Sequence, residues 1–278
     1  QKNLEAAQTF LKKARELDPR NVSALCGLGY IANYEKNEAS ARSFLQQALN
    51  ADGQCAYAAI ALKKIYGQRG LHLEYLAFDA GDPPGWRAAK TRTVKPVVEE
   101  GKIRWRGAMT GAAARDIEYT AAVEAADFVE FSADLEIKPE SPSSLTLKLA
   151  SKLGAGVRFF VEFGKDESSN LAYRFRDYGG GDDAWHSIGP WPKEGRVRLG
   201  LESPDLLRTG MVNFYVNGEN KGSLTLKLKA PGRLEVGLSA AVPARGAIDA
   251  SADNVALLLR PASGSTTNTI NTSRRIRL

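Results

Sequence analysis

The stretch NFYVNGENKGSLTLKLKAPGRLEVGLSA, residues 213–240, decides the fold of the larger part of this chain. Apolar and polar residues alternate within its segments, which is the period of a strand with one buried face. The pairs Asn217-Gly218 and Pro231-Gly232 separate these segments and favour tight turns. The stretch therefore predicts consecutive antiparallel strands joined by short connections.

The same alternation recurs over most of the remaining chain. It is clearest at residues 103–105, 129–137, 145–149, 157–163, 171–175, 197–201, 212–216, 224–228, 234–238 and 255–259. About ten short strands with no helical period between them are typical of an antiparallel β-sandwich or jelly roll. We therefore expect the chain beyond residue 86 to be all-β.

The end of this pattern resembles the C-terminal half of concanavalin-like and laminin-G-like jelly rolls. FYVNG at 214–218, the strand that follows it and DNV at 253–255 carry the resemblance, which extends more weakly back to Gly85 and Trp86. The resemblance implies a sandwich over 86–262, with Asp253 and Asn254 capping the start of the last strand. Related domains bind sugars, proteins or calcium, and some hydrolyse glycosides, so the fold alone assigns no chemistry.

The first seventy residues contain an internal repeat with a period of 34 residues. Ala7, Leu11, Ala14 and Pro19 recur as Ala41, Leu45, Ala48 and Gly53, with Leu25, Leu28, Gly29 and Ala32 between them. This pattern, with LDPRN at 17–21, resembles the tetratricopeptide family, although Lys36 and Asn37 stand where a turn glycine is usual. We expect those departures to loosen the turn.

The tetratricopeptide resemblance implies a groove that binds a protein partner. Its groove-facing positions include Tyr30, Asn33, Tyr34, Tyr57 and Lys64. Because such repeats bury their apolar faces only by stacking, we expect further repeats upstream of residue 1.

The expected fold class is multidomain α + β, with helical hairpins followed by a sandwich. We expect a partial repeat array at 1–70, a linker at 71–85 containing AGDPPGW, the sandwich at 86–262 and a basic tail at 263–278. A purely structural alternative is that the sandwich caps the array, because the connection between the two parts is short.

Composition excludes several classes of protein. No apolar run approaches the roughly 20 residues that span a bilayer, and Gln1–Glu5 lacks the features of an export signal. The residues assign no compartment, and a bacterial extracytoplasmic one stays open. Cys26 and Cys55 are too few for a disulfide framework or a cysteine-based metal site. A net charge of +6 favours anionic partners, but we expect no nucleic acid partner.

A catalytic set is hard to assemble from these residues. Glu124, Asp127 and Glu130 come nearest to the acidic strand motif of jelly-roll glycosidases, but their spacing places Glu124 and Asp127 on opposite strand faces. His186 lies in GGGDDAWHSIGPW at 179–191, where neighbouring side chains diverge. We predict that the protein is not an enzyme, with a jelly-roll glycoside hydrolase as the alternative.

Two groups of residues are candidates for ligand binding on the sandwich. In the loop, Trp185 and Trp191 offer indole rings for sugars, while Asp182 and Asp183 accept hydrogen bonds or bind Ca²⁺; no other cofactor is expected. Arginines also occupy alternate strand positions, namely Arg158, Arg174, Arg176, Arg196 and Arg198. If their strands adjoin, they form one basic face for polyanions; otherwise they pair with glutamates across strands.

These observations predict a non-catalytic interaction protein. The helical segment is expected to bind a protein partner, and the sandwich a carbohydrate or a second protein surface.

Overall fold

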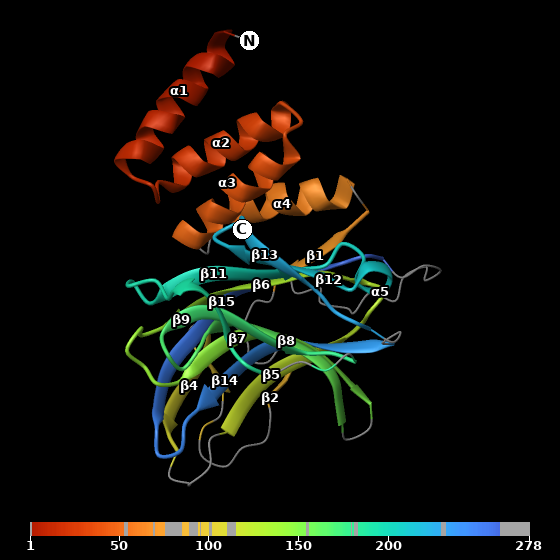
Figure 1. Cartoon of the computed structure of the whole chain (residues 1–278). Coiled ribbons are helices and arrows are strands. Elements are labelled where there is room, and N and C mark those ends of the chain that lie inside the picture. Colours follow the sequence, from red (N-terminus) through yellow and green to blue (C-terminus); the bar gives the residue numbers. More distant parts are fainter. Residues whose placement is uncertain are drawn as a thin grey trace.

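The computed structural model has two parts, a layered set of helices and a two-sheet sandwich (Figure 1). It describes residues 2–52, 55–68, 70–75, 85–88, 94, 96–99, 102–109, 115–153, 156–178, 180, 183–228 and 232–261. The expected α + β fold class is confirmed. The basic tail at 263–278 and most of the 71–85 segment lie outside the described residues.

Four helices precede the sandwich, and consecutive helices pack against each other. They are α1 (Lys2–Leu17), α2 (Val22–Tyr34), α3 (Glu38–Ala51) and α4 (Ala56–Gln68). The Asn21 side chain caps α2 by accepting a hydrogen bond from the amide of Ala24, at 2.9 Å. None of the described helices is long and apolar enough to cross a bilayer.

The turn between α2 and α3 is tighter than the sequence suggested. Lys36 adopts the left-handed conformation, φ 61°, that a glycine usually takes at this position. Asn37 then caps α3 by accepting a hydrogen bond from the amide of Ser40, at 3.1 Å. The two residues that we expected to loosen this turn therefore end one helix and begin the next.

The sandwich consists of two antiparallel sheets, here called sheet A and sheet B. Sheet A has the order β13-β12-β11-β6-β15-β4-β3, and β1 also pairs with β15; sheet B has the order β10-β9-β8-β7-β14-β5-β2. The strands of sheet A are β1 (His72–Tyr75), β3 (Pro96–Glu99), β4 (Lys102–Ala108), β6 (Phe128–Ile137), β11 (Arg196–Glu202), β12 (Met211–Val216), β13 (Glu219–Thr225) and β15 (Ala247–Leu259). Those of sheet B are β2 (Arg87–Ala88), β5 (Arg115–Glu124), β7 (Ser144–Leu153), β8 (Gly156–Lys165), β9 (Asn170–Arg176), β10 (His186–Pro190) and β14 (Arg233–Val242). A short helix, α5 (Leu206–Thr209), joins β11 to β12.

Most expected strands are present, and five more were not predicted: β1, β2, β3, β5 and β10. Residues 72–75, expected to be linker, form β1 and pair with the end of β15. The strand expected at 224–228 begins earlier and ends at Thr225. Short apolar patterns explain three of the missed strands, because β1 and β3 have four residues each and β2 has two.

The expected cap at Asp253 and Asn254 is wrong. Both residues lie in the middle of β15, where the pairing with β6 shifts between Asp253 and Ala256. Asn254 is in the left-handed region, φ 49°, which asparagine tolerates better than most residues. Asn254 and Val255 therefore lie opposite the single residue Ala133 and form a β-bulge, which a local sequence pattern cannot distinguish from a strand end.

The main core lies between the two sheets. Trp105, Tyr119, Phe131, Phe163 and Phe214 are among its fully buried side chains. Trp86 is also buried there, and its ring stacks on Tyr119 at 5.4 Å between centroids.

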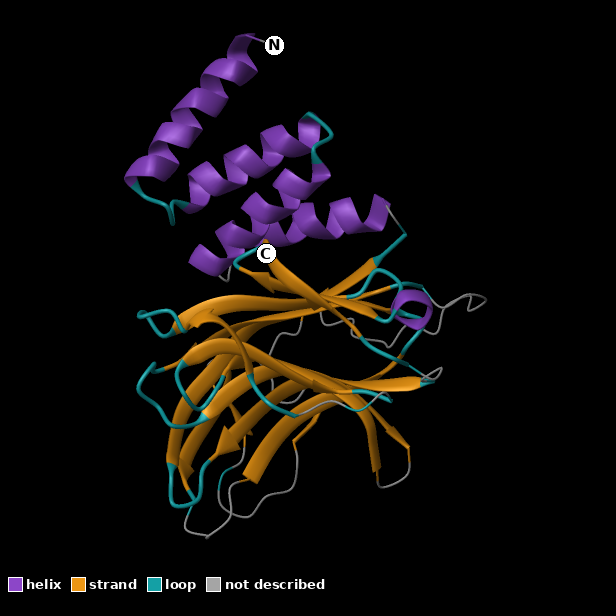
Figure 2. Ribbon diagram, in the orientation of Figure 1, coloured by secondary structure: helices purple, strands orange, loops and turns teal. Residues whose placement is uncertain are grey.

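The helices lie on the outer face of sheet A (Figure 2). A second core joins the two parts, and its sandwich members are Leu73, Val129, Ala256 and Leu258. Val129 reaches this core because it is an extra residue in β6. Leu258 and Leu259 of β15 pair with the residues on either side of it, which leaves Val129 without a partner in the ladder. The direct packing agrees with the short connection between the parts.

Two helical glycines provide a test of the helical core. A Cβ at Gly29 would come within 2.8 Å of Leu45 Cγ, whereas one at Gly67 would have nothing within 4 Å. We expect Gly29→Ala to lower the free energy of unfolding, since overpacking costs about 1–3 kcal/mol. Gly67→Ala, the matched control, should be neutral or raise it by up to about 1 kcal/mol. Urea titrations followed by circular dichroism measure both; equal effects of the two variants would contradict the packing described.

Candidate functional site

The side chains that join α3 to sheet A include one arginine that contacts two glutamates. Arg42 Nη2 lies 3.3 Å from Glu130 Oε2 and 3.6 Å from Glu202 Oε1, and its Nε donates to the Tyr66 hydroxyl at 3.1 Å. The Tyr215 hydroxyl donates to Glu202 at 2.7 Å. A cavity of about 130 Å³ lies beside this group. The cluster therefore links a helix to two central strands.

Burial shifts the titration of two members of this cluster. Burial raises the pKa of Glu130, and Arg42 opposes that rise. Burial and the hydrogen bond to Glu202 raise the pKa of Tyr215 to about 12. Glu130, one of the three carboxylates considered for catalysis, is thus enclosed under the helices.

The raised pKa of Glu130 predicts a pH-dependent stability difference. The folded protein holds this proton to a higher pH than the unfolded chain, so ionisation of Glu130 weakens folding as the pH rises above the ordinary glutamate range, about 4.3. Relative to the unchanged protein, Glu130→Gln should gain stability as the pH rises above about 4.3. Thermal unfolding across this range measures the effect, with Glu136→Gln, a half-exposed residue of the same strand, as control. A constant offset between Glu130→Gln and the unchanged protein would refute it.

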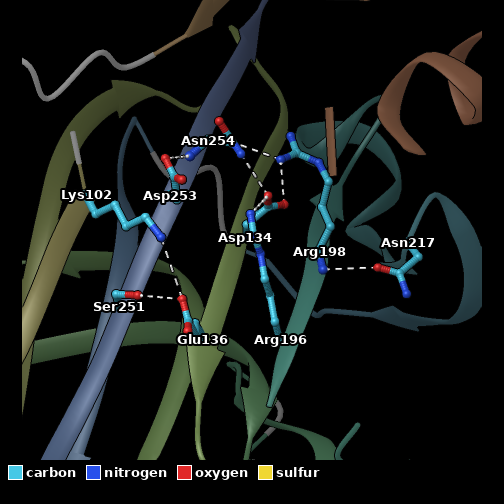
Figure 3. Close-up of polar contacts among 9 residues, drawn as sticks. All are labelled: Lys102, Asp134, Glu136, Arg196, Arg198, Asn217, Ser251, Asp253 and Asn254. Carbon is cyan, nitrogen blue, oxygen red and sulfur yellow. Dashed lines mark hydrogen bonds and ion pairs between the residues drawn. The ribbon is translucent and has the colours of Figure 1, made fainter. Parts of the chain in front are cut away.

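A second polar cluster surrounds Asp134 on the same face of sheet A (Figure 3). Its Oδ1 lies 3.1 Å from Arg198 Nη1, and its Oδ2 lies 3.1 Å from Arg196 Nη2. Asn254, at the bulge of β15, donates to Asp134 Oδ2 at 2.8 Å, and its carbonyl accepts from Arg198 at 3.1 Å. The bulge therefore completes the shell of a nearly buried carboxylate.

A cavity of about 330 Å³ lies between this cluster and the helices. Its lining residues include Pro19, Arg20, Gln47, Asp134, Arg196 and Arg198. The Arg198 side chain is 4% exposed, and its guanidinium also donates to Ser132 Oγ at 2.9 Å. Because the arginines contact groups of the sheet itself, the cluster stabilises the sheet beneath the helices.

Removing Asp134 should be costly. Asp134→Ala leaves the buried Arg198 without its carboxylate, and breaking a buried pair in this way costs about 3–5 kcal/mol. Asp249→Ala, which removes the exposed partner of Arg106, should cost about 0–1 kcal/mol. Guanidinium unfolding of both variants measures the contrast, and a loss below about 1 kcal/mol for Asp134→Ala would contradict this role.

The outer face of sheet B carries a different arrangement, which we call the outer strip. It consists of Glu118, Lys148, Glu162, Arg174 and Trp185. Lys148 Nζ contacts Glu118 and lies 3.4 Å from Glu162 Oε1. It reaches Glu118 on β5 across β14, where Gly237 pairs with Lys148. A side chain there would meet the Tyr119 carbonyl at 2.2 Å, so the site requires glycine.

Arg174 is held from several sides within the outer strip. It pairs with Glu162, directly opposite on β8, at 2.6 Å. Its guanidinium lies 5.8 Å from the centre of the Phe160 ring and 4.8 Å from that of Trp185. The Glu162 and Lys148 side chains are 3% and 9% exposed, while that of Arg174 is 23% exposed. The strip thus has a nearly buried floor and a more accessible edge at Arg174 and Trp185.

The single basic face for polyanions is absent among the described residues. Arg174 and Arg176 lie on β9 of sheet B, whereas Arg196 and Arg198 lie on β11 of sheet A. All four have acidic partners: Glu162 for Arg174, Asp183 for Arg176, and Asp134 for Arg196 and Arg198. The side chain of Arg158 is outside the described residues. Cross-strand pairing, the alternative reading, is confirmed for Arg174 and Glu162.

The candidate binding residues of the 179–191 segment do not lie together in one site among the described residues. Trp191 is buried in the core and donates to the Ile137 carbonyl at 3.1 Å, so it offers no surface for a sugar. His186 stacks on Tyr173 at the sandwich edge. Asp182 lies outside the described residues, and no group of three metal-ligating side chains occurs among those described.

The three candidate catalytic carboxylates do not share a site. Glu124 lies at the end of β5 in sheet B, 3.8 Å from Arg233, and both side chains are largely exposed. Asp127 is in the turn after β5, and Glu130 is enclosed under α3 on sheet A. The spacing argument assumed one strand through Glu124 and Asp127, whereas β5 ends at Glu124 and a turn follows it.

The groove positions expected on the helices all lie on α2 and α4. Tyr30, Asn33, Tyr34, Tyr57 and Lys64 are exposed. With Ile60, three of them form what we call the aromatic face, whose members Tyr30, Tyr34, Tyr57 and Ile60 are 49–64% exposed. Burial raises the pKa of Tyr57, and the nearby Cys26, Tyr30 and Cys55 raise it further. Tyr57 therefore lies close to residues of the neighbouring helix.

Sequence reasoning missed most of the outer strip. Arg174 and Trp185 were candidates and glutamates were expected only as pairing partners, whereas Glu118 and Lys148 were not considered. The sequence pattern that could have pointed to these two residues is a charged residue at an outward position of an otherwise apolar strand, such as Lys148 in SLTLKLASKL. Assembly of the strip depends on strand order, which the local pattern does not contain.

Comparison with solved structures places the sandwich among known folds. An endo-β-galactosidase from Clostridium perfringens that releases GlcNAcα1-4Gal aligns with a TM-score of 0.52 at 8% identity, covering 71% of this chain and 65% of that one. An endo-acting O-glycanase of the human gut microbiota aligns with a TM-score of 0.51 at 8% identity, covering 67% and 98%. The carbohydrate recognition domain of Emp47p aligns with a TM-score of 0.47 at 9% identity, covering 69% and 95%.

The sandwich has the concanavalin-like jelly-roll fold. The endo-β-galactosidase and the endo-acting O-glycanase share this fold. The chain spans just under two thirds of the endo-β-galactosidase that it matches. No protein-family model matches the sequence, and no curated protein matches it either.

Proposed function

We propose that this chain is a non-catalytic interaction protein whose sandwich binds a neutral carbohydrate at the outer strip. The observation that carries the proposal is the fixed position of Arg174, paired with Glu162 and covered by the half-buried indole of Trp185. An aromatic ring beside pre-positioned polar groups is a suitable contact for a sugar. The sugar ring stacks on the aromatic ring, while the polar groups orient the sugar hydroxyls.

Charge balance favours a neutral ligand over a polyanion. The outer strip contains two cations, Lys148 and Arg174, and two carboxylates, Glu118 and Glu162. These charges are paired with each other, so the strip offers no excess positive potential to an anionic polymer. The described helices occupy the sheet A side of the sandwich, so sheet B supplies the remaining broad face (Figure 2).

The helical segment is proposed to bind a protein partner through the aromatic face, as the tetratricopeptide resemblance implies. Four large side chains exposed on two helices form an apolar surface of the kind that docks a peptide or helix. The opposite side of the helical layer is buried on sheet A. The two proposed binding surfaces therefore belong to different sides of the molecule.

The carbohydrate proposal is tested by glycan binding. The intact chain is screened against neutral mucin-type O-glycans and galactose-containing oligosaccharides, and hits are measured by calorimetry. Trp185→Ala should weaken binding at least about tenfold, or about 1.4 kcal/mol, while Trp185→Phe retains part of it. Tyr34→Ser, on the aromatic face, is the control and should bind normally. Unchanged affinity in Trp185→Ala, or no neutral ligand in the screen, would refute the site.

A glycoside hydrolase is the alternative function, and one observation favours it. Glu118 and Glu162 both contact Lys148 Nζ, so two carboxylates approach each other on one face of sheet B. Retaining glycosidases hold such a pair about 5–5.5 Å apart. However, the Lys148 ammonium occupies the space between them, where the scissile bond would have to lie. Turnover of the same glycans that is lost in Glu118→Gln and Glu162→Gln would establish the alternative.

A further inference from the structure

The two cysteines of the chain, 29 residues apart, meet at the surface of the helical segment. Cys26 lies within α2, and Cys55 directly precedes α4. Their sulfur atoms are 3.5 Å apart, and both residues are half-buried. The 34-residue repeat explains the meeting, because it places the start of α4 beside α2. Sequence spacing alone gave no reason to pair them.

We propose that Cys26 and Cys55 are a redox site that closes into a disulfide between α2 and α4. Closure requires the sulfur atoms to approach from 3.5 Å to about 2.05 Å. Cys55 is the residue just before α4, and its carbonyl accepts a hydrogen bond from the amide of Ala59 in the first turn of that helix. A residue at a helix boundary can move by this amount without breaking the helix that follows.

The oxidant is a low-molecular-weight disulfide, for which glutathione disulfide is the probe. The Cys55 thiolate attacks one sulfur of the probe, forming a mixed disulfide and releasing one glutathione thiolate. The Cys26 sulfur, once deprotonated, then attacks the Cys55 sulfur, forming the internal disulfide and releasing the second glutathione. The protein loses two electrons and two protons, and the probe becomes two glutathione molecules. Burial and the neighbouring Cys55 raise the pKa of Cys26 to about 12, so its thiolate is scarce and the second step proceeds because the Cys55 sulfur is held beside it.

The disulfide would have a structural effect on the aromatic face. Tyr57 lies near both cysteines and near Tyr30. A covalent link between α2 and α4 fixes the relative position of the two helices that carry these rings. Oxidation would therefore hold the aromatic face in one arrangement, whichever partner it binds. The redox proposal does not depend on the proposed carbohydrate function.

The test measures closure in the intact, folded chain. Reduced protein is equilibrated with mixtures of glutathione and glutathione disulfide, quenched with acid, and examined by mass spectrometry. The expected product is a monomer that has lost two hydrogens, with tryptic peptides 21–36 and 43–63 joined. Because the second thiol is held close by, closure should need at least about tenfold less oxidant than glutathionylation of a single-cysteine variant. The melting temperature of the oxidised form should rise by several degrees.

Cys26→Ser and Cys55→Ser are the matched controls, since each keeps one thiol and replaces the other with a hydroxyl of similar shape. Neither should gain thermal stability on oxidation, and Cys26→Ser should stop at the mixed disulfide on Cys55. Two glutathione groups on the unchanged protein, covalent dimers, or closure only in denaturant would each overturn the proposal.

Discussion

The ion pairs of Arg42 with Glu130 and Glu202 join a helix to the centre of sheet A, where both glutamates are nearly buried. Taking three charged groups out of water is expensive, and mutual attraction offsets this cost only with good geometry. The apolar contacts of Val129 and Leu258 with the helices supply the burial that the ion pairs alone would not. We infer that the charges fix how the helices lie on the sheet, while the apolar contacts hold them there.

This junction determines which surfaces of the chain remain for ligands. It covers one face of sheet A, leaving the outer strip on sheet B and the aromatic face on α2 and α4. The two surfaces differ chemically. The outer strip consists of balanced charges beside one indole, whereas the aromatic face has tyrosine rings and one isoleucine. The two exposed surfaces therefore differ in the side chains that they present.

The sequence predicted the fold class because alternation and the 34-residue repeat are local signals. It failed where the structure depends on pairing between distant strands. Asn254 shows the difference, since the jelly-roll resemblance implied a strand start there, yet the partner strand β6 makes it a bulge beside Asp134. The arginines show it again: identical alternation on β9 and β11 puts Arg174 and Arg198 on different sheets, because strand order is not encoded locally. Lys148 and Glu118 come together for the same reason.

The pairing of β1 with β15 has a mechanical consequence. His72 lies opposite Leu259, so the chain enters the sandwich from the helices at the same end of this ladder at which β15 leaves it. A pull between the helices and the end of β15 would act across the ladder and separate its four residue pairs one after another. Such unzipping needs less force than shearing all of them together. Tension applied at these two points would therefore load this four-residue seam in its weakest direction.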